Sequence, residues 1–267
     1  DLYYTAFGQF YHPFGNIIIM NLLDLVFPKR CVSCNKIGKY FCKICITKIK
    51  HINFQICPVC EKAAMDGAIH PKCQTKYSLD GLTAFFHYDG PIRQAVKLLK
   101  YRFVSDLAKE FINLIPSLSL QLITHNQSRR SGIHDAVITY TSQTASGQPT
   151  TFIPIPLHPS RQKFRGFNQA EVLGRLLAAK LNIPVRTDIL KRGKKTIPQV
   201  EMKDRKKRLQ NMEDVFAVNR LTMKQWNNVT IFLFDDVFTT GATLRSAANI
   251  LKRAGAKSVW GIVMAHG

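Results

Sequence analysis

Seven cysteines and one histidine in the first third of the chain have the spacing of metal ligands. Three Cys-x2-Cys pairs are followed by one His-x2-Cys pair, and each pair can direct two ligand atoms to one cation. Two pairs complete the tetrahedron that zinc prefers in structural sites, so the spacing predicts two structural Zn2+ ions. The predicted ligands are Cys31, Cys34, Cys42, Cys45, Cys57, Cys60, His70 and Cys73.

The spacing leaves two ligand pairings open. Sequential pairing gives one site of four cysteines and one of three cysteines with a histidine, whereas cross-braced pairing places the first and third pairs on one metal. A redox pair or an iron–sulfur cluster is the other use of such cysteines, and the regular tandem spacing argues against both. With four protein ligands each, the metals have no open position for catalysis.

An apolar run that ends in two acids and a turn of small residues forms a second chemical pattern. The acids, Asp235 and Asp236, can accept hydrogen bonds from the vicinal hydroxyls of a ribose. N–H groups at a helix start and threonine hydroxyls can bind a phosphate, and Gly241 permits close backbone approach. The predicted phosphate-binding residues are Thr239, Thr240, Gly241, Ala242 and Thr243.

Two other interpretations of this pattern fit less well. A Walker B strand of an ATPase also ends in acids, but the sequence contains no G-x-x-x-x-G-K-[ST] phosphate loop. A strand, turn and helix with a simple cap needs one threonine, not an acid pair and three threonines. The pattern therefore favours a ligand with a ribose and a phosphate.

Both patterns need secondary structure that holds them in place. Apolar periodicity predicts strands at residues 82–88, 136–140, 152–156, 229–234 and 258–265. Helical spacing predicts helices at residues 91–103, 169–182 and 243–254, and Ser105 or Asp106 can cap another. This alternation predicts an α/β domain with a mainly parallel sheet flanked by helices, and with ligands at the carboxyl ends of the strands.

Composition limits the class of protein. The 267 residues include 38 Lys+Arg and 17 Asp+Glu, and the formal net charge of +21 favours anionic partners. An odd number of cysteines, all between residues 31 and 73, argues against a disulfide-stapled secreted domain. The longest apolar run, residues 17–27, is too short for a membrane span and is interrupted by Asn21 and Asp24. We therefore expect a cytoplasmic protein without membrane insertion.

The segment of acids and threonines resembles the phosphoribosyl pyrophosphate (PRPP) loop of type I phosphoribosyltransferases. The cysteine module and two further blocks, residues 88–101 and 153–169, resemble the corresponding parts of the ComF/GntX family. This resemblance implies a type I phosphoribosyltransferase-like α/β fold with a small N-terminal double zinc ribbon. The implied division is an uninformative extension at residues 1–19, the double zinc ribbon at 20–78 and the phosphoribosyltransferase-like domain at 79–267.

The resemblance also implies ligands and site residues. PRPP would bind with Mg2+ at the loop, and Arg165 and Gly166 would lie near the pyrophosphate, where arginine suits bidentate contact with phosphate. Arg161 and Lys163 would add positive charge there. The sequence identifies neither a catalytic residue nor the acceptor of a phosphoribosyl group.

A basic segment at residues 191–208, with nine lysines or arginines and two acids, leaves two functions open. It would cover PRPP in an enzyme that transfers a phosphoribosyl group, or it would bind the phosphates of single-stranded DNA beside the zinc ribbon. The family resemblance favours a link to DNA uptake in natural competence, with PRPP, single-stranded DNA and other DNA-uptake proteins as partners. The alternative is a catalytically inactive, PRPP-responsive protein that either binds single-stranded DNA or has a regulatory function.

Overall fold

The computed structural model describes residues 28–101, 105–120, 123, 150–193, 215–219 and 229–267. The described strands are β1 (Gly81–His87), β2 (Thr150–Pro154), β3 (Leu190–Arg192), β4 (Phe216–Val218), β5 (Thr230–Phe238) and β6 (Ser258–His266). The described helices are α2 (Lys43–Ile46), η1 (Met65–Gly67), η2 (Pro71–Cys73), α3 (Gly90–Tyr101), α4 (Ser105–Asn113), α6 (Pro159–Arg165), α7 (Gln169–Lys180) and α10 (Ala242–Arg253). None of these helices combines the length and the apolar content that a membrane span requires.

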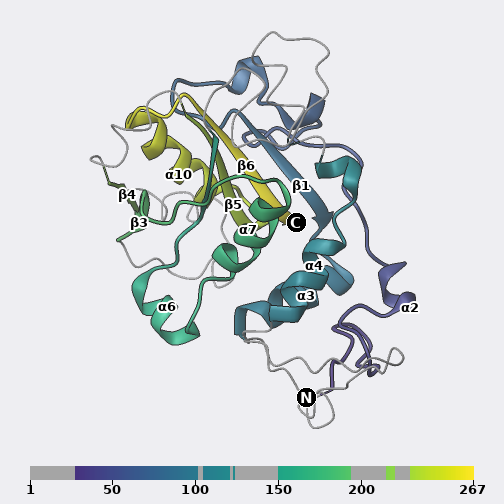
Figure 1. Ribbon diagram of the computed structural model, residues 1–267. Coiled ribbons are helices and arrows are strands. Elements are labelled where there is room, and N and C mark those ends of the chain that lie inside the picture. Colours follow the sequence, from purple (N-terminus) through teal and green to yellow (C-terminus); the bar gives the residue numbers. More distant parts are fainter. Residues whose placement is uncertain (1–27, 102–104, 121–122, 124–149, 194–214, 220–228) are drawn as a thin grey trace, which may run out of the picture.

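Four strands form a parallel sheet in the order β1-β6-β5-β2, with helices on both of its faces (Figure 1). This architecture confirms the predicted α/β class. The strands and helices expected in the described residues are present within a few residues of their predicted bounds. The largest difference is in β5, which continues beyond Phe234 through both acids because it stays paired with β6 as far as Phe238.

From Ile231 to Phe234 the side chains of β5 alternate between two hydrophobic cores, and the order is reversed at Val237 and Phe238. Phe232 and Phe234 belong to the core that includes α3, α4 and α7, whereas Ile231 and Leu233 belong to the core that includes α10. Because successive side chains of a strand point to opposite faces, the same alternation sends Asp236 toward α3 and α7 and its neighbour Asp235 toward the opposite face. The two acids are therefore not equivalent.

Several short elements were not predicted from the sequence. Helix α6 lies within the block at residues 153–169, for which no helix was predicted; the His158 side chain accepts the Ser160 N–H at its start, and Gly166, with φ of +77°, ends it. Strands β3 and β4 form a separate antiparallel pair, each too short to show a period of two. Three expectations lie outside the described residues: the extension at 1–19, the strand at 136–140, and the basic segment from residue 194 onward.

The chain between Cys45 and Cys57 lies along the outer edge of β1. The Ile52 N–H donates to the Phe85 carbonyl at 3.0 Å. The Gln55 side chain accepts from the Ala84 N–H at 2.8 Å and donates to the Ala84 carbonyl at 3.0 Å. These bonds satisfy backbone groups that an uncovered edge strand would leave open. The cysteine-rich part thus completes the sheet edge.

The residues just before Cys42 pack against helix α4. One Glu110 carboxylate oxygen accepts the N–H groups of Tyr40 and Phe41 at 3.1 and 3.3 Å. The Phe41 and Phe111 ring centroids lie 6.0 Å apart, within the core that also contains Phe86 of β1. Residues on both sides of the boundary expected near residue 79 therefore contribute to one hydrophobic core.

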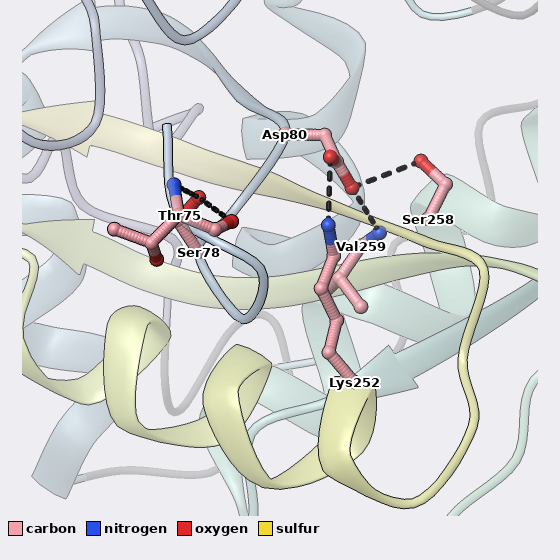
Figure 2. Close-up of polar contacts among 6 residues, drawn as sticks. All are labelled: Thr75, Ser78, Asp80, Lys252, Ser258 and Val259. Carbon is pink, nitrogen blue, oxygen red and sulfur yellow. Dashed lines mark hydrogen bonds and ion pairs between the residues drawn. The ribbon is translucent and has the colours of Figure 1, made fainter. Parts of the chain in front are cut away.

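A buried carboxylate joins the start of β1 to the end of α10 and the start of β6. Figure 2 shows Asp80 accepting from Lys252 Nζ at 2.7 Å, from the Val259 N–H at 2.8 Å and from Ser258 Oγ at 3.1 Å. The side chains of Asp80 and Lys252 are about one-tenth exposed. This network fixes the end of α10 that lies away from the loop after β5.

Candidate metal centres and ligand-binding site

The structure gathers the eight predicted metal ligands into two groups of four. In each group the ligand atoms lie within 4.8 Å of one another; the groups are Cys31, Cys34, Cys42 and Cys45, and Cys57, Cys60, His70 and Cys73. The grouping is sequential, not cross-braced. In the first group, the Cys34 and Cys42 sulfur atoms are 3.7 Å apart, close to the separation of about 3.8 Å that a tetrahedral zinc with bonds of about 2.3 Å requires.

Other groups around the sulfurs and the histidine suit a metal cation. His70 Nε2 donates to the Ala63 carbonyl at 3.0 Å, so the Nδ1 lone pair faces Cys60 Sγ at 3.2 Å. Burial raises the pKa values of Cys31 and Cys57, but nearby backbone N–H donors more than offset this and lower them to about 6 and about 7. Burial and the neighbouring cysteines raise the pKa values of Cys45 and Cys73 to about 12 and about 11. The types and the closeness of the ligand atoms fit structural Zn2+.

Elemental analysis of the purified protein is expected to give two zinc ions per chain, one for each ligand group. Cys34→Ser and Cys60→Ser should each remove one zinc, because a three-ligand structural site binds metal more weakly. Leu118→Ser, a change at an exposed position outside both groups, is the control and should retain two. Iron in place of zinc, or loss of both ions from either single variant, would contradict two independent zinc sites.

At the end of β5, Asp236 lies in a chain of polar side chains. Its carboxylate pairs with Lys100 of α3 at 3.1 Å and accepts from Gln169 of α7 at 3.3 Å. The Gln169 oxygen in turn accepts from Arg165 Nη1 at 3.1 Å. The Asp236 side chain is only 8% exposed, so this carboxylate chiefly orients cationic side chains at the carboxyl ends of the strands.

The other acid, Asp235, interacts with a partly different set of charges. Burial and the neighbouring Asp236 charge raise the pKa of Asp235 to about 8, although the cations Lys100 and Arg192 act in the opposite direction. Burial, followed by repulsion from Arg161, lowers the pKa of Arg192. Arg192 thus lies close enough to both Asp235 and Arg161 for their charges to interact, and an anion bound there would relieve the repulsion between the two arginines.

The loop between β5 and α10 has the shape expected of a phosphate loop. Gly241 has φ of +68°, and a Cβ at this position would lie 2.4 Å from a Phe238 ring carbon. The Ala242 N–H points to Thr240 Oγ1 at 3.4 Å. A small open hollow borders the loop, lined by Asp235, Val237, Phe238, Thr239 and the residues Gly241 to Leu244. The predicted residues Thr239 to Thr243 therefore all belong to one turn at the start of α10.

The Arg165 to Gln169 block lies between the ends of β2 and β5. Asn168 caps α7 by accepting the Ala170 N–H at 3.1 Å and donates to the Ile155 carbonyl, just beyond β2, at 2.9 Å. The Arg165 guanidinium lies over the Tyr101 ring, 5.9 Å from its centroid. Gly166 has no atom near its Cβ position, so its positive φ and its place at the end of α6 account for the glycine.

Sequence reasoning missed two basic residues of this site, and it included Arg192 only as a member of the basic segment at residues 191–208. The two missed residues, Lys100 and Arg245, lie on helices, where lysine and arginine are ordinary surface residues. The alternation along β5 could have shown that its two acids face opposite sides. It could not have shown that a cation from α3 would meet one of them, because that contact depends on packing across 136 residues of sequence.

Comparison with known proteins supports the N-terminal assignment. Residues 22–74 match the double zinc ribbon domain. The double zinc ribbon that the family resemblance implied for the cysteine module is thus confirmed. The match covers the N-terminal part of the chain and does not extend to the parallel sheet.

The chain is also similar to curated proteins over much of its length. It is 36% identical to competence protein F of Haemophilus influenzae over 121 residues, which is 44% of this chain and 51% of that protein, about half the relative's length. It is 25% identical to competence protein ComFC of Bacillus subtilis over 80% of this chain and 78% of that protein. It is 28% identical to DNA utilization protein YhgH of Escherichia coli O157:H7, over 82% and 93% respectively.

Proposed function

We propose that this protein binds PRPP with Mg2+ at the loop after β5 and takes part in the uptake or use of DNA. The choice of PRPP as ligand rests on one observation. Two acids at the carboxyl end of a buried strand lead directly into a glycine turn and the start of α10. In an open parallel sheet, ligands bind at this end of the strands. The acids suit ribose hydroxyls, and the turn suits a phosphate.

The surrounding charges support an extended anion rather than a lone phosphate. Lys100, Arg161, Arg165 and Arg192 all lie near the carboxyl ends of β2 and β5. Arginine side chains bind pyrophosphate oxygens in a bidentate manner. Mg2+, bound through carboxylate and phosphate oxygens, would neutralise part of the pyrophosphate charge. In this proposal Asp235 accepts from the ribose, and the cations orient the pyrophosphate.

The link to DNA rests on the relatives. Two are named competence proteins and one is named a DNA utilization protein. The zinc ribbon packed on the sheet edge and the large positive charge are compatible with a protein that works beside nucleic acid.

At a pH above the raised pKa of about 8, where the Asp235 carboxylate is ionised, Asp235→Asn is expected to weaken binding of Mg-PRPP by roughly 10- to 100-fold, because a hydrogen bond to a charged group contributes about 1.5–3 kcal/mol. Asp235 is preferred to Asp236 as the test, since removing Asp236 would leave Lys100 without its carboxylate. Isothermal calorimetry with Mg-PRPP measures the affinity of each variant.

The control is Asp188→Asn, which removes a half-exposed carboxylate whose partner is Arg186. This variant should bind PRPP as the wild type does. Equal affinity of wild type and Asp235→Asn would place the ligand elsewhere. Release of pyrophosphate with a supplied acceptor separates phosphoribosyl transfer from binding alone, and it leaves the binding measurement unaffected.

A further inference from the structure

One arginine connects the second cysteine group to the loop after β5. Arg245 lies in the first turn of α10, and its Nη1 donates to the carbonyls of Pro58 and Val59 at 3.2 and 3.3 Å. Its Nη2 donates to the Thr240 carbonyl. Pro58 and Val59 are the two residues between Cys57 and Cys60, so one guanidinium spans a metal-binding pair and the proposed phosphate loop.

The metal should determine where these two carbonyls point. When Cys57 and Cys60 bind one ion, the turn between them is closed, and the backbone N–H groups of Val59 and Cys60 donate to the Cys57 sulfur. Its two carbonyls then face α10, where they accept from Arg245. Without the metal, the turn loses its main constraint, because metal binding supplies much of the folding energy of so short a segment. Arg245 would then lose its fixed acceptors.

We propose that metal binding at Cys57, Cys60, His70 and Cys73 and PRPP binding at the loop are energetically coupled through Arg245. The guanidinium holds the Thr240 carbonyl in place, and with it the backbone of the turn at which the phosphate would bind. Arg245 is a positioning residue, and metal binding at the second zinc site therefore changes the affinity for PRPP. This inference rests on the proposed function. Coupling is reciprocal, so PRPP must also stabilise the zinc that favours its binding.

The first test compares three variants in Mg-PRPP calorimetry. Arg245→Met should weaken affinity about tenfold, within the usual range of coupling between two sites. Arg245→Lys should weaken it by nearly as much, because an ammonium keeps the charge but lacks the planar fork that reaches both segments. The matched control is Arg253→Met on the same helix, where the side chain contacts Tyr77 and Asn249 instead; its affinity should equal that of the wild type.

The second test follows zinc release to a coloured chelator, with and without Mg-PRPP. In the wild type PRPP should slow the release of one of the two zinc ions about tenfold, and this protected phase should be missing from Cys60→Ser. In Arg245→Met PRPP should not change the release rate. A purely structural role of Arg245 would alter the release rate equally with and without PRPP, so the ratio of the two rates is decisive.

The outcomes separate the two proposals. If the wild type gives no binding heat with PRPP, the proposed function is wrong and this inference is wrong with it. If PRPP binds but Arg245→Met binds equally well, or if PRPP protects zinc equally in that variant, the coupling alone is wrong. Thermal unfolding of Arg245→Met within a few degrees of Arg253→Met would show that the comparison is between folded proteins.

Discussion

Asp80→Ala is expected to lower the free energy of unfolding by about 3–5 kcal/mol, the usual cost of removing one partner from a buried ion pair. The substitution leaves the buried Lys252 ammonium without its carboxylate and also removes the acceptor of the Val259 N–H. These groups join β1, α10 and β6 (Figure 2), so the loss should lower the midpoint of thermal or denaturant unfolding of the whole sheet.

The double variant Asp80→Ala/Lys252→Met tests the cause. Replacing both charges with apolar side chains removes the unpaired cation, so the double variant should be more stable than Asp80→Ala alone. Asp188→Ala is the surface control; its carboxylate is half exposed and pairs with Arg186, and its loss should cost less than about 1 kcal/mol. Equal losses in Asp80→Ala and Asp188→Ala would show that the buried network does not stabilise the fold.

The parts of the site that the sequence predicted are those whose chemistry is local. The Cys-x2-Cys pairs and the acids before Gly241 lie within a few residues of one another, so spacing alone indicates that they act together. The apolar run of β5 and the helix after it were predicted for the same reason. What spacing could not provide was the choice between sequential and cross-braced ligand groups, which depends on how the linker folds along β1.

The contacts that were missed are those between distant segments. Arg245 meets Pro58 across 187 residues, and Lys252 meets Asp80 across 172. Both basic residues occupy a helix whose sequence is that of an ordinary amphipathic surface helix. Only the assembled fold shows that the cysteine-rich part covers α10 at both ends, through Arg245 near the loop and through Tyr77 beside Arg253. Such partners are chosen by tertiary packing, which leaves no local pattern in the sequence.

Gly241→Ala is expected to weaken Mg-PRPP binding about 30-fold or more. An L-residue at the φ of +68° found here costs about 1–2 kcal/mol, and the added methyl would lie 2.4 Å from a Phe238 ring carbon. Overpacking of this kind costs about 1–3 kcal/mol more. The loop would relax to another shape, and affinity falls in proportion to the fraction of molecules that keep the binding shape. Calorimetry with Mg-PRPP measures this loss.

Two further variants separate backbone strain from the clash. Gly38→Ala also places a methyl at positive φ, but no atom lies within 4 Å of its Cβ position, and it lies between Cys34 and Cys42; PRPP affinity should be unchanged. Gly241→Ala/Phe238→Leu removes part of the ring and should restore affinity in part, because the backbone cost remains. Wild-type affinity in Gly241→Ala would mean that the shape of this loop does not control the ligand. Full recovery in the double variant would assign the whole effect to the Phe238 ring.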